Sequence, residues 1–128
     1  MRPLEKKLAL ARKHLGKVQS SWDPLDWAEL SMFGMYCLEA AVDAASMHFG
    51  MPTEAAHHAR VANARELTQA HGLPDIAELL VELNTIRKSE AYGDIEHPPE
   101  VDAEDVAGAI KGYLDAVESA IGGRNAGA

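Results

Sequence analysis

The chain has 128 residues and a mass of 13.8 kDa, the size of one domain that can bury a proper core. Hydrophobic residues make up 47% of it and glycines number only 10, so the composition favours a packed helical protein over a β-sandwich or a disordered chain. The single Cys37 excludes an intramolecular disulfide and a zinc site built from several cysteines. The net charge of −8 argues against a broad nucleic-acid-binding surface.

Charge is distributed unevenly along the chain. Six basic residues and one acid give residues 1–20 a net charge of +5, so the total of −8 leaves −13 for the rest; the six are Arg2, Lys6, Lys7, Arg12, Lys13 and Lys17. This asymmetry indicates either a helix that faces a polyanion or a solvated basic face that docks near acidic helices. We favour the second interpretation because runs of charge commonly serve only to solvate a surface.

The amino-terminal stretch is too charged to contain the apolar core of a signal peptide. The most apolar run, Leu30 to Ala45, carries Glu39 and Asp43 and is short for a membrane span. We therefore expect a soluble cytoplasmic protein with no membrane association.

Two helices are predicted before residue 50. The first begins at Pro3, which suits a first helical turn, and carries apolar residues at steps of three and four. Asp23 caps the second, which runs from Leu25 to Phe49 and stops at Gly50. Because this second helix is apolar nearly all round, we expect it to be central to a bundle or shared with another subunit.

Three more helices are predicted after it. Thr53 caps one that ends at about residue 71, and Asp75 caps a fourth that ends near Tyr92. Asp102 opens a fifth helix, which Gly122 ends. No strand alternation appears, so the prediction is an all-α, antiparallel up-down bundle of about five helices, with one domain over 1–121 and a flexible tail over 122–128.

One charged residue stands out on the fourth predicted helix. Arg87 leaves the edge of its apolar stripe, so its guanidinium needs a partner, for which Glu39, Asp43 or Glu90 could serve. Tyr92 comes five positions later, where the helix ends. The pair is either a reactive site or a purely structural device, in which Arg87 closes a salt bridge and Tyr92 seals the helix end.

Four segments in order, "MYCLEAAVDAASMHFG", "HHARVANARELTQAHGL", "LLVELNTIRKSEAYGD" and "VDAEDVAGAIKGYLDAV", resemble the small bacterial HEPN (higher eukaryotes and prokaryotes nucleotide-binding) domains over about residues 25–121. The resemblance implies a helical bundle that dimerises and places an Arg-x4–6-His motif from each subunit in a shared cleft. Many members are metal-independent endoribonucleases of toxin or phage-defence systems, and several are paired with a nucleotidyltransferase.

Carried onto this chain, the resemblance makes Arg87 the motif arginine, while Tyr92 stands where the ribonucleases have histidine. A tyrosine with a pKa near 10 is a poor replacement for that base. His97 lies beyond the usual spacing. Arg87, Tyr92 and His97 are thus the catalytic candidates if the chain cleaves RNA. The binding candidates are Arg87, Lys88, Tyr92, Glu39, Asp43 and His58.

Other constellations favour plainer interpretations. Glu54 and His57 have the spacing found in di-iron bundles, but the chain has no second Glu-x-x-His, so we expect no metal and no cofactor. His57 and His58 point about 100° apart on a helix, so one of them should be exposed. Cys37, in an alanine-rich stretch, is expected to be a small core residue and not a nucleophile.

These observations support three candidate functions. The first is a non-cleaving dimeric HEPN-like module that binds RNA, a nucleotide or a partner protein, in a defence or toxin–antitoxin setting. The second is a metal-independent ribonuclease toxin that uses Arg87 with Tyr92 or His97. The third is a structural helical interaction protein. We favour the first because Arg87 matches the motif arginine, whereas no histidine follows it at the spacing of the motif.

Overall fold

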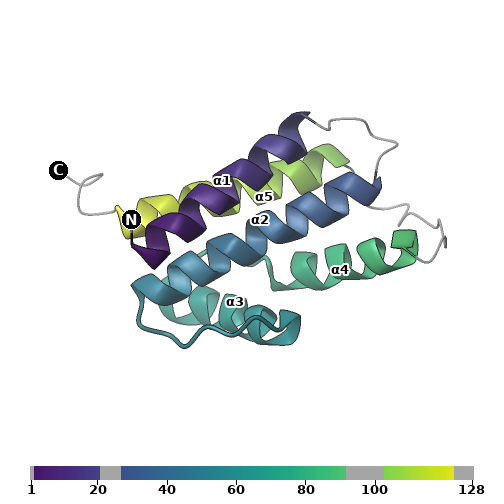
Figure 1. Cartoon of the computed structure of the whole chain (residues 1–128). Coiled ribbons are helices and arrows are strands. Elements are labelled where there is room, and N and C mark those ends of the chain that lie inside the picture. The colour runs from purple at the N-terminus through teal and green to yellow at the C-terminus, as the bar shows by residue number, and fades with distance from the viewer. Residues whose placement is uncertain (1, 21–26, 92–102, 123–128) are drawn as a thin grey trace.

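The computed structural model describes residues 2–20, 27–91 and 103–122, and within these ranges every regular element is an α-helix. The elements are α1 (Pro3–Ser20), α2 (Trp27–His48), α3 (His57–His71), α4 (Ala77–Ala91) and α5 (Ala103–Ile121). The predicted all-α bundle of about five helices is confirmed. In Figure 1, α1, α2, α4 and α5 alternate in direction along the bundle.

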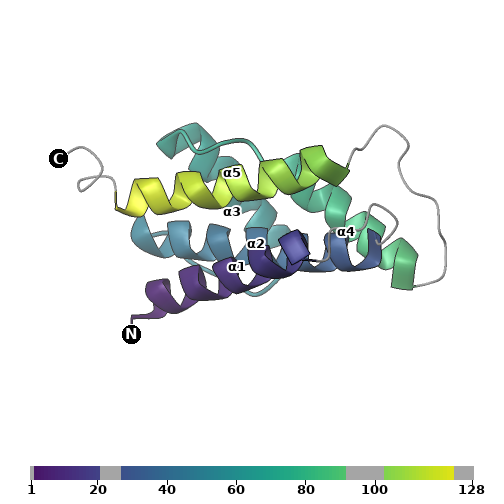
Figure 2. The same ribbon diagram turned by 90° about the horizontal axis from the view of Figure 1, so that it is seen from above.

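The second helix is the centre of the bundle. It packs against α1, α3, α4 and α5 (Figures 1 and 2). Leu38, Ala41 and Ala45 of α2 are fully buried, in one core that includes Leu67 of α3 and Leu114 of α5. The nearly uniform apolar character of α2 therefore reflects neighbours on several sides within one chain.

The two short helices α3 and α4 lie beside different halves of α2. Gly34 of α2 allows close packing there, because a Cβ on this residue would lie 2.7 Å from Ile110 Cδ1 of α5 and 3.6 Å from Leu83 Cδ1 of α4. The polar contacts of α3 instead reach Glu39, Asp43 and Ser46, nearer the end of α2. Thus α4 lies beside the first half of α2 and α3 beside the second, as Figure 1 shows.

Most predicted helix ends are confirmed. Pro3 opens α1, and the Asp75 carboxylate accepts a hydrogen bond from the Ala77 amide at 3.4 Å and so caps α4. Gly50 and Gly72 come after α2 and α3 with φ of 73° and 72°, in the left-handed region that glycine adopts without strain. The predicted caps Asp23 and Asp102 lie outside the described residues, as do residues 123–128 of the predicted tail.

The predicted start of α3 is wrong. Thr53 caps nothing, because the helix begins at His57 after an extended Ala56 that makes no side-chain cap hydrogen bond. Side chains from α3 hold the preceding segment outside the helix. Arg60 donates to the Ala55 carbonyl at 2.9 Å, and an Asn63 amide hydrogen bonds to the Pro52 carbonyl at 2.9 Å.

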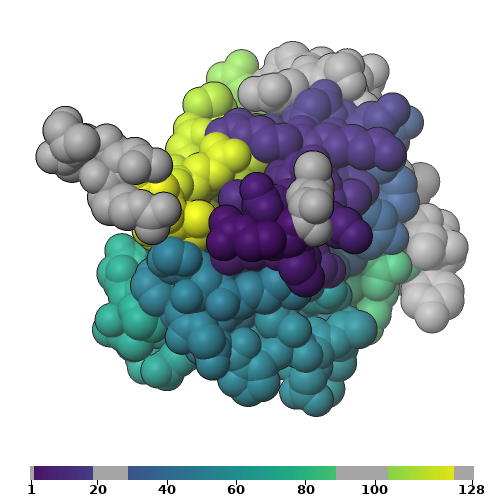
Figure 3. Space-filling model, turned by 60° about the vertical axis from the view of Figure 1, so that its left-hand side comes forward, coloured from purple at the N-terminus to yellow at the C-terminus, as the bar shows by residue number. Residues whose placement is uncertain are grey.

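The basic first helix docks beside acids of the same chain, as the favoured interpretation of its charge predicts. Lys7 pairs with Asp43 of α2 at 3.0 Å, and Arg12 pairs with Asp115 and Glu118 of α5. Lys6 and Lys13 are exposed. Figure 3 shows the first turns of α1, in purple, against the surface formed by the end of α2 and the segment after it. Among the described residues, no helix combines the length and apolarity needed to cross a membrane.

Candidate functional site

Arg87 lies in the last turns of α4 and is partly buried. Its Nη2 donates a hydrogen bond to Asn84 Oδ1 at 2.9 Å, from one turn earlier on the same helix. Its Nε is buried and has no hydrogen-bond acceptor within the described part of the chain. The described residues therefore offer this guanidinium a neutral amide and leave one of its donors unsatisfied.

The rest of the predicted motif cannot be placed beside Arg87. Tyr92 and His97 lie outside the described residues, and so does the side chain of Glu90. Lys88, the next residue along α4, is exposed. The structure thus describes the arginine half of the predicted site and one basic neighbour.

The two α2 carboxylates proposed as partners of Arg87 bind other cations. Asp43 accepts hydrogen bonds from Arg60 of α3, from Nε at 3.1 Å and from Nη2 at 2.8 Å. Glu39 lies 3.2 Å from His57 Nδ1 and 3.6 Å from Arg60 Nη1. This part of the prediction is wrong because Leu83, one turn before Arg87, packs near Gly34, and Asp43 is about 13 Å further along α2 at ~1.5 Å per residue.

These side chains form one connected network of ion pairs and hydrogen bonds, which we call the Asp43 cluster: Lys7, Glu39, Asp43, His57 and Arg60. Asp43 is only 2% exposed, so its charge must be compensated by the two cations that reach it. The hydrogen bonds with Asp43 raise the pKa of the Arg60 guanidinium, against the effect of burial. The cluster joins α1 and α3 to α2.

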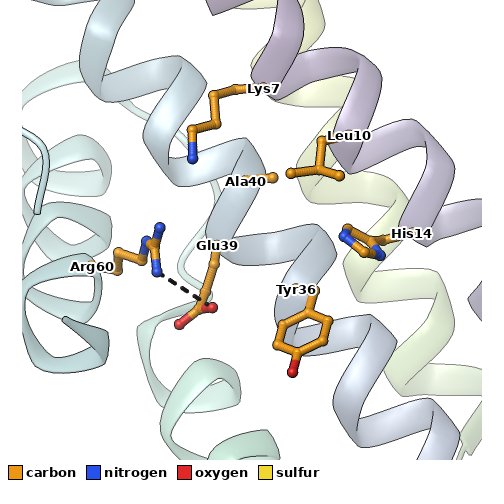
Figure 4. A pocket seen from close by; sticks show the side chains of 7 residues that line it. All are labelled: Lys7, Leu10, His14, Tyr36, Glu39, Ala40 and Arg60. Carbon is orange, nitrogen blue, oxygen red and sulfur yellow. Dashed lines mark ion pairs between the residues drawn. The ribbon is translucent and has the colours of Figure 1, made fainter. Parts of the chain in front are cut away.

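A pocket of about 160 Å³ opens above the Asp43 cluster, between α1, α2 and α3 (Figure 4). Its lining combines one charged side with one aromatic and apolar side: Lys7, Leu10, His14, Tyr36, Glu39, Ala40 and Arg60. The His14 and Tyr36 rings lie 5.4 Å apart between centroids, tilted by 55°. Ala40, which is almost completely buried, lines the pocket with its methyl group.

His14 is an unusual member of this lining. Burial lowers the pKa of its imidazole, and the neighbouring charge of Lys13 lowers it further. Both effects favour the neutral form of the imidazole. Its Nδ1 is buried and has no hydrogen-bond partner among the residues that the structure describes. No pattern in the sequence singles out this residue.

The structure also places the two neighbouring histidines of α3, the possible metal ligands and Cys37. His58 is exposed and His57 is partly buried against Glu39, which confirms that one of the pair faces solvent. In the described part of the chain, no three His, Cys, Asp or Glu side chains are grouped so that they could hold a metal ion. Cys37 is fully buried, and burial raises the pKa of its thiol to about 12, so it is a core residue as predicted.

Comparisons with known proteins give no match: no family model, no curated protein and no solved structure matches this chain.

Proposed function

We propose that this chain is a HEPN-like, non-cleaving binding module that holds a phosphate of RNA or of a nucleotide at Arg87. The observation that supports the proposal is that no carboxylate among the described residues pairs with Arg87. The described residues give this partly buried guanidinium only the amide of Asn84, and its buried Nε–H has no acceptor among them. Arginine binds phosphate through several charge-assisted hydrogen bonds, so guanidinium donors other than the buried Nε could hold a phosphate oxygen.

The residues after Arg87 in the sequence favour binding over cleavage. The motif spacings place Tyr92, Gly93 and Asp94 where a histidine would be needed. Proton transfer near neutral pH needs a group whose pKa lies close to that pH, and an ordinary tyrosine does not have one. A ribonuclease that uses Arg87 with Tyr92 or His97 is the competing hypothesis, and a purely structural helical partner is the third.

The setting of this activity rests on the HEPN resemblance. We propose a homodimer in which the Arg87 ends of two copies enclose the ligand, in a bacterial cytoplasmic defence or toxin–antitoxin system. A nucleotidyltransferase or another protein would be the partner. A monomer by light scattering at micromolar concentration would contradict the shared cleft.

The proposal is tested by fluorescence anisotropy with a labelled single-stranded RNA of about 20 nucleotides, with ATP and GTP as competitors. Arg87→Ala should weaken binding about tenfold or more, because it removes a charge-assisted contact from a partly buried site. Arg87→Lys should retain part of the affinity. The matched control is Arg65→Ala, since Arg65 is an exposed arginine on α3 whose described ion-pair partner, Glu78, is 3.7 Å away.

Gel analysis of the same mixtures separates binding from cleavage. Intact RNA with the wild type, and affinity lost in Arg87→Ala but kept in Arg65→Ala, support a binding module. RNA cleavage that disappears in Arg87→Ala would replace it with the ribonuclease hypothesis. Equal affinity in all three proteins would remove Arg87 from the site.

A further inference from the structure

A second surface, on the other side of α2, has the composition of a protein-docking site. Lys6 and Lys13 are exposed on α1, and the apolar Leu10 between them is 40% exposed. At ~100° per residue, Lys6 lies about 40° and Lys13 about 60° from Leu10 around the helix. The two cations therefore run beside one exposed apolar side chain, at the edge of the pocket that Leu10 lines.

The pocket next to this stripe is large enough for one side chain. Its volume is about 160 Å³, and a cavity of about 150 Å³ can hold a benzene ring. Its exposed aromatic wall is Tyr36, which is 37% exposed, beside the His14 ring. Exposed aromatic and aliphatic groups around a small hollow are typical of the anchor positions that dominate protein–protein binding.

The charges around the pocket favour an acidic ligand on the α1 side only. The acids on the far wall and below it are already engaged, since Glu39 lies beside His57 and Asp43 binds Arg60 and Lys7. Lys6 and Lys13 make the outward charge of α1 positive. The Glu39 carboxylate and the net negative charge of the rest of the chain disfavour a long polyanion such as RNA across this face.

We propose that this surface, formed by Lys6, Leu10, Lys13, His14 and Tyr36, docks an acidic peptide segment of a partner protein. One aromatic or aliphatic side chain of that segment fills the pocket above Ala40. Its Asp or Glu residues pair with Lys6 and Lys13. The His14 and Tyr36 rings, 5.4 Å apart between centroids, line the pocket that receives this side chain. This surface is separate from the Arg87 site and does not depend on it.

The test uses a labelled peptide of about 12 residues, rich in glutamate with one central phenylalanine, in anisotropy and ¹⁵N chemical-shift titrations of the full chain. Shifts should concentrate at Lys6 to His14 and at Tyr36. Replacing the central phenylalanine by serine should weaken binding about tenfold, because it removes the buried anchor. A version with lysine in place of each glutamate should not bind.

Protein variants locate the charge contribution. Lys6→Glu and Lys13→Glu should each weaken binding about threefold to fivefold, and Tyr36→Ala about tenfold, because rim charges contribute less than an anchor. Arg65→Glu, which makes the same charge change on α3, should stay within about twofold of the wild type. Arg87→Ala should bind the peptide as the wild type does, so the outcome is independent of the proposed RNA site.

Four results would overturn the proposal. They are absence of shifts at α1 and Tyr36, equal affinity for the phenylalanine and serine peptides, and equal weakening by Arg65→Glu and Lys13→Glu. The fourth is displacement of the peptide from these residues by a short RNA or by self-association of the chain, which would assign the surface to a different partner.

Discussion

Two arginines, each on a short helix beside α2, are held in opposite ways. Arg60 of α3 donates two hydrogen bonds to the Asp43 carboxylate, at 3.1 and 2.8 Å, and a third to the Ala55 carbonyl. Arg87 of α4 donates one to the neutral amide of Asn84. Within the described residues, Arg60 pairs with a carboxylate of another helix, whereas Arg87 has no such ion pair. The first is a structural arginine, and under the proposed function the second binds a ligand.

The two arginines should also differ in how much they contribute to the stability of the fold. Breaking a buried ion pair by removing one partner costs about 3–5 kcal/mol, because the other charge is left buried and uncompensated. The Arg60 side chain is only 16% exposed and Asp43 is almost completely buried, so their pair belongs to this class. Removing Arg87 leaves no such buried carboxylate among the described residues, so its loss should cost little stability.

The largest expected effect is that of Asp43→Asn. The change keeps the shape of the side chain but leaves Arg60 and Lys7 without their shared carboxylate, so the free energy of unfolding should fall by about 3 kcal/mol. Urea unfolding followed by circular dichroism measures it. The matched control is Asp115→Asn, which removes an exposed partner of Arg12 and should cost less than about 1 kcal/mol. Equal losses in the two variants would mean that the Asp43 cluster is no more than a surface network.

A smaller effect is expected for Lys7→Ala. Its side chain is 30% exposed and shares Asp43 with Arg60, so most of the compensation of Asp43 remains after its removal. We expect a loss of about 1 kcal/mol in the same urea experiment, since partly exposed ion pairs contribute little. A loss as large as that of Asp43→Asn would show that Lys7, and not Arg60, is the main partner of the buried carboxylate.

The smallest effect is a dependence of stability on pH at His14. Burial lowers the pKa of this residue in the folded chain, so in the window below the ordinary value of about 6.5 the unfolded chain binds more protons. Folding stability should therefore decrease as the pH falls through that window. In His14→Gln, the decrease in Tm between about pH 7.5 and 5.5 should be smaller than in the wild type.

The exposed histidine on α3 provides the control for that comparison. His58→Gln makes the same substitution at an exposed position on α3, and it should leave the slope of Tm against pH as it is in the wild type. Parallel slopes in the wild type and both variants would mean that the imidazole of His14 is not desolvated in the folded chain.

Local signals predicted most of the fold. The apolar character of α2, the cap at Asp75 and the glycines after α2 and α3 each act within a few residues, so the sequence alone indicates them. The cap at Thr53 failed because α3 side chains reach back to the Pro52 and Ala55 carbonyls and hold that segment extended. Such contacts depend on how α3 lies on α2.

The candidate sites were less predictable for the same reason. A carboxylate at Asp43, in a run of buried residues, signals that some cation must reach it, but 12 lysines and arginines could do so. Only the packing of α1 and α3 selects Lys7 and Arg60. The pocket beside His14 was missed because it is formed by three helices and has no pattern along the chain.

The most direct measurement compares Arg60→Ala with Arg87→Ala for both unfolding free energy and RNA affinity. Arg60→Ala should lose about 3 kcal/mol of stability, because it leaves Asp43 buried with Lys7 alone, and should keep its RNA affinity under folding conditions. Arg87→Ala should stay within about 0.5 kcal/mol of the wild type and lose RNA affinity about tenfold. An Arg87→Ala protein that unfolds as easily as Arg60→Ala and binds RNA like the wild type would contradict the proposed role of Arg87.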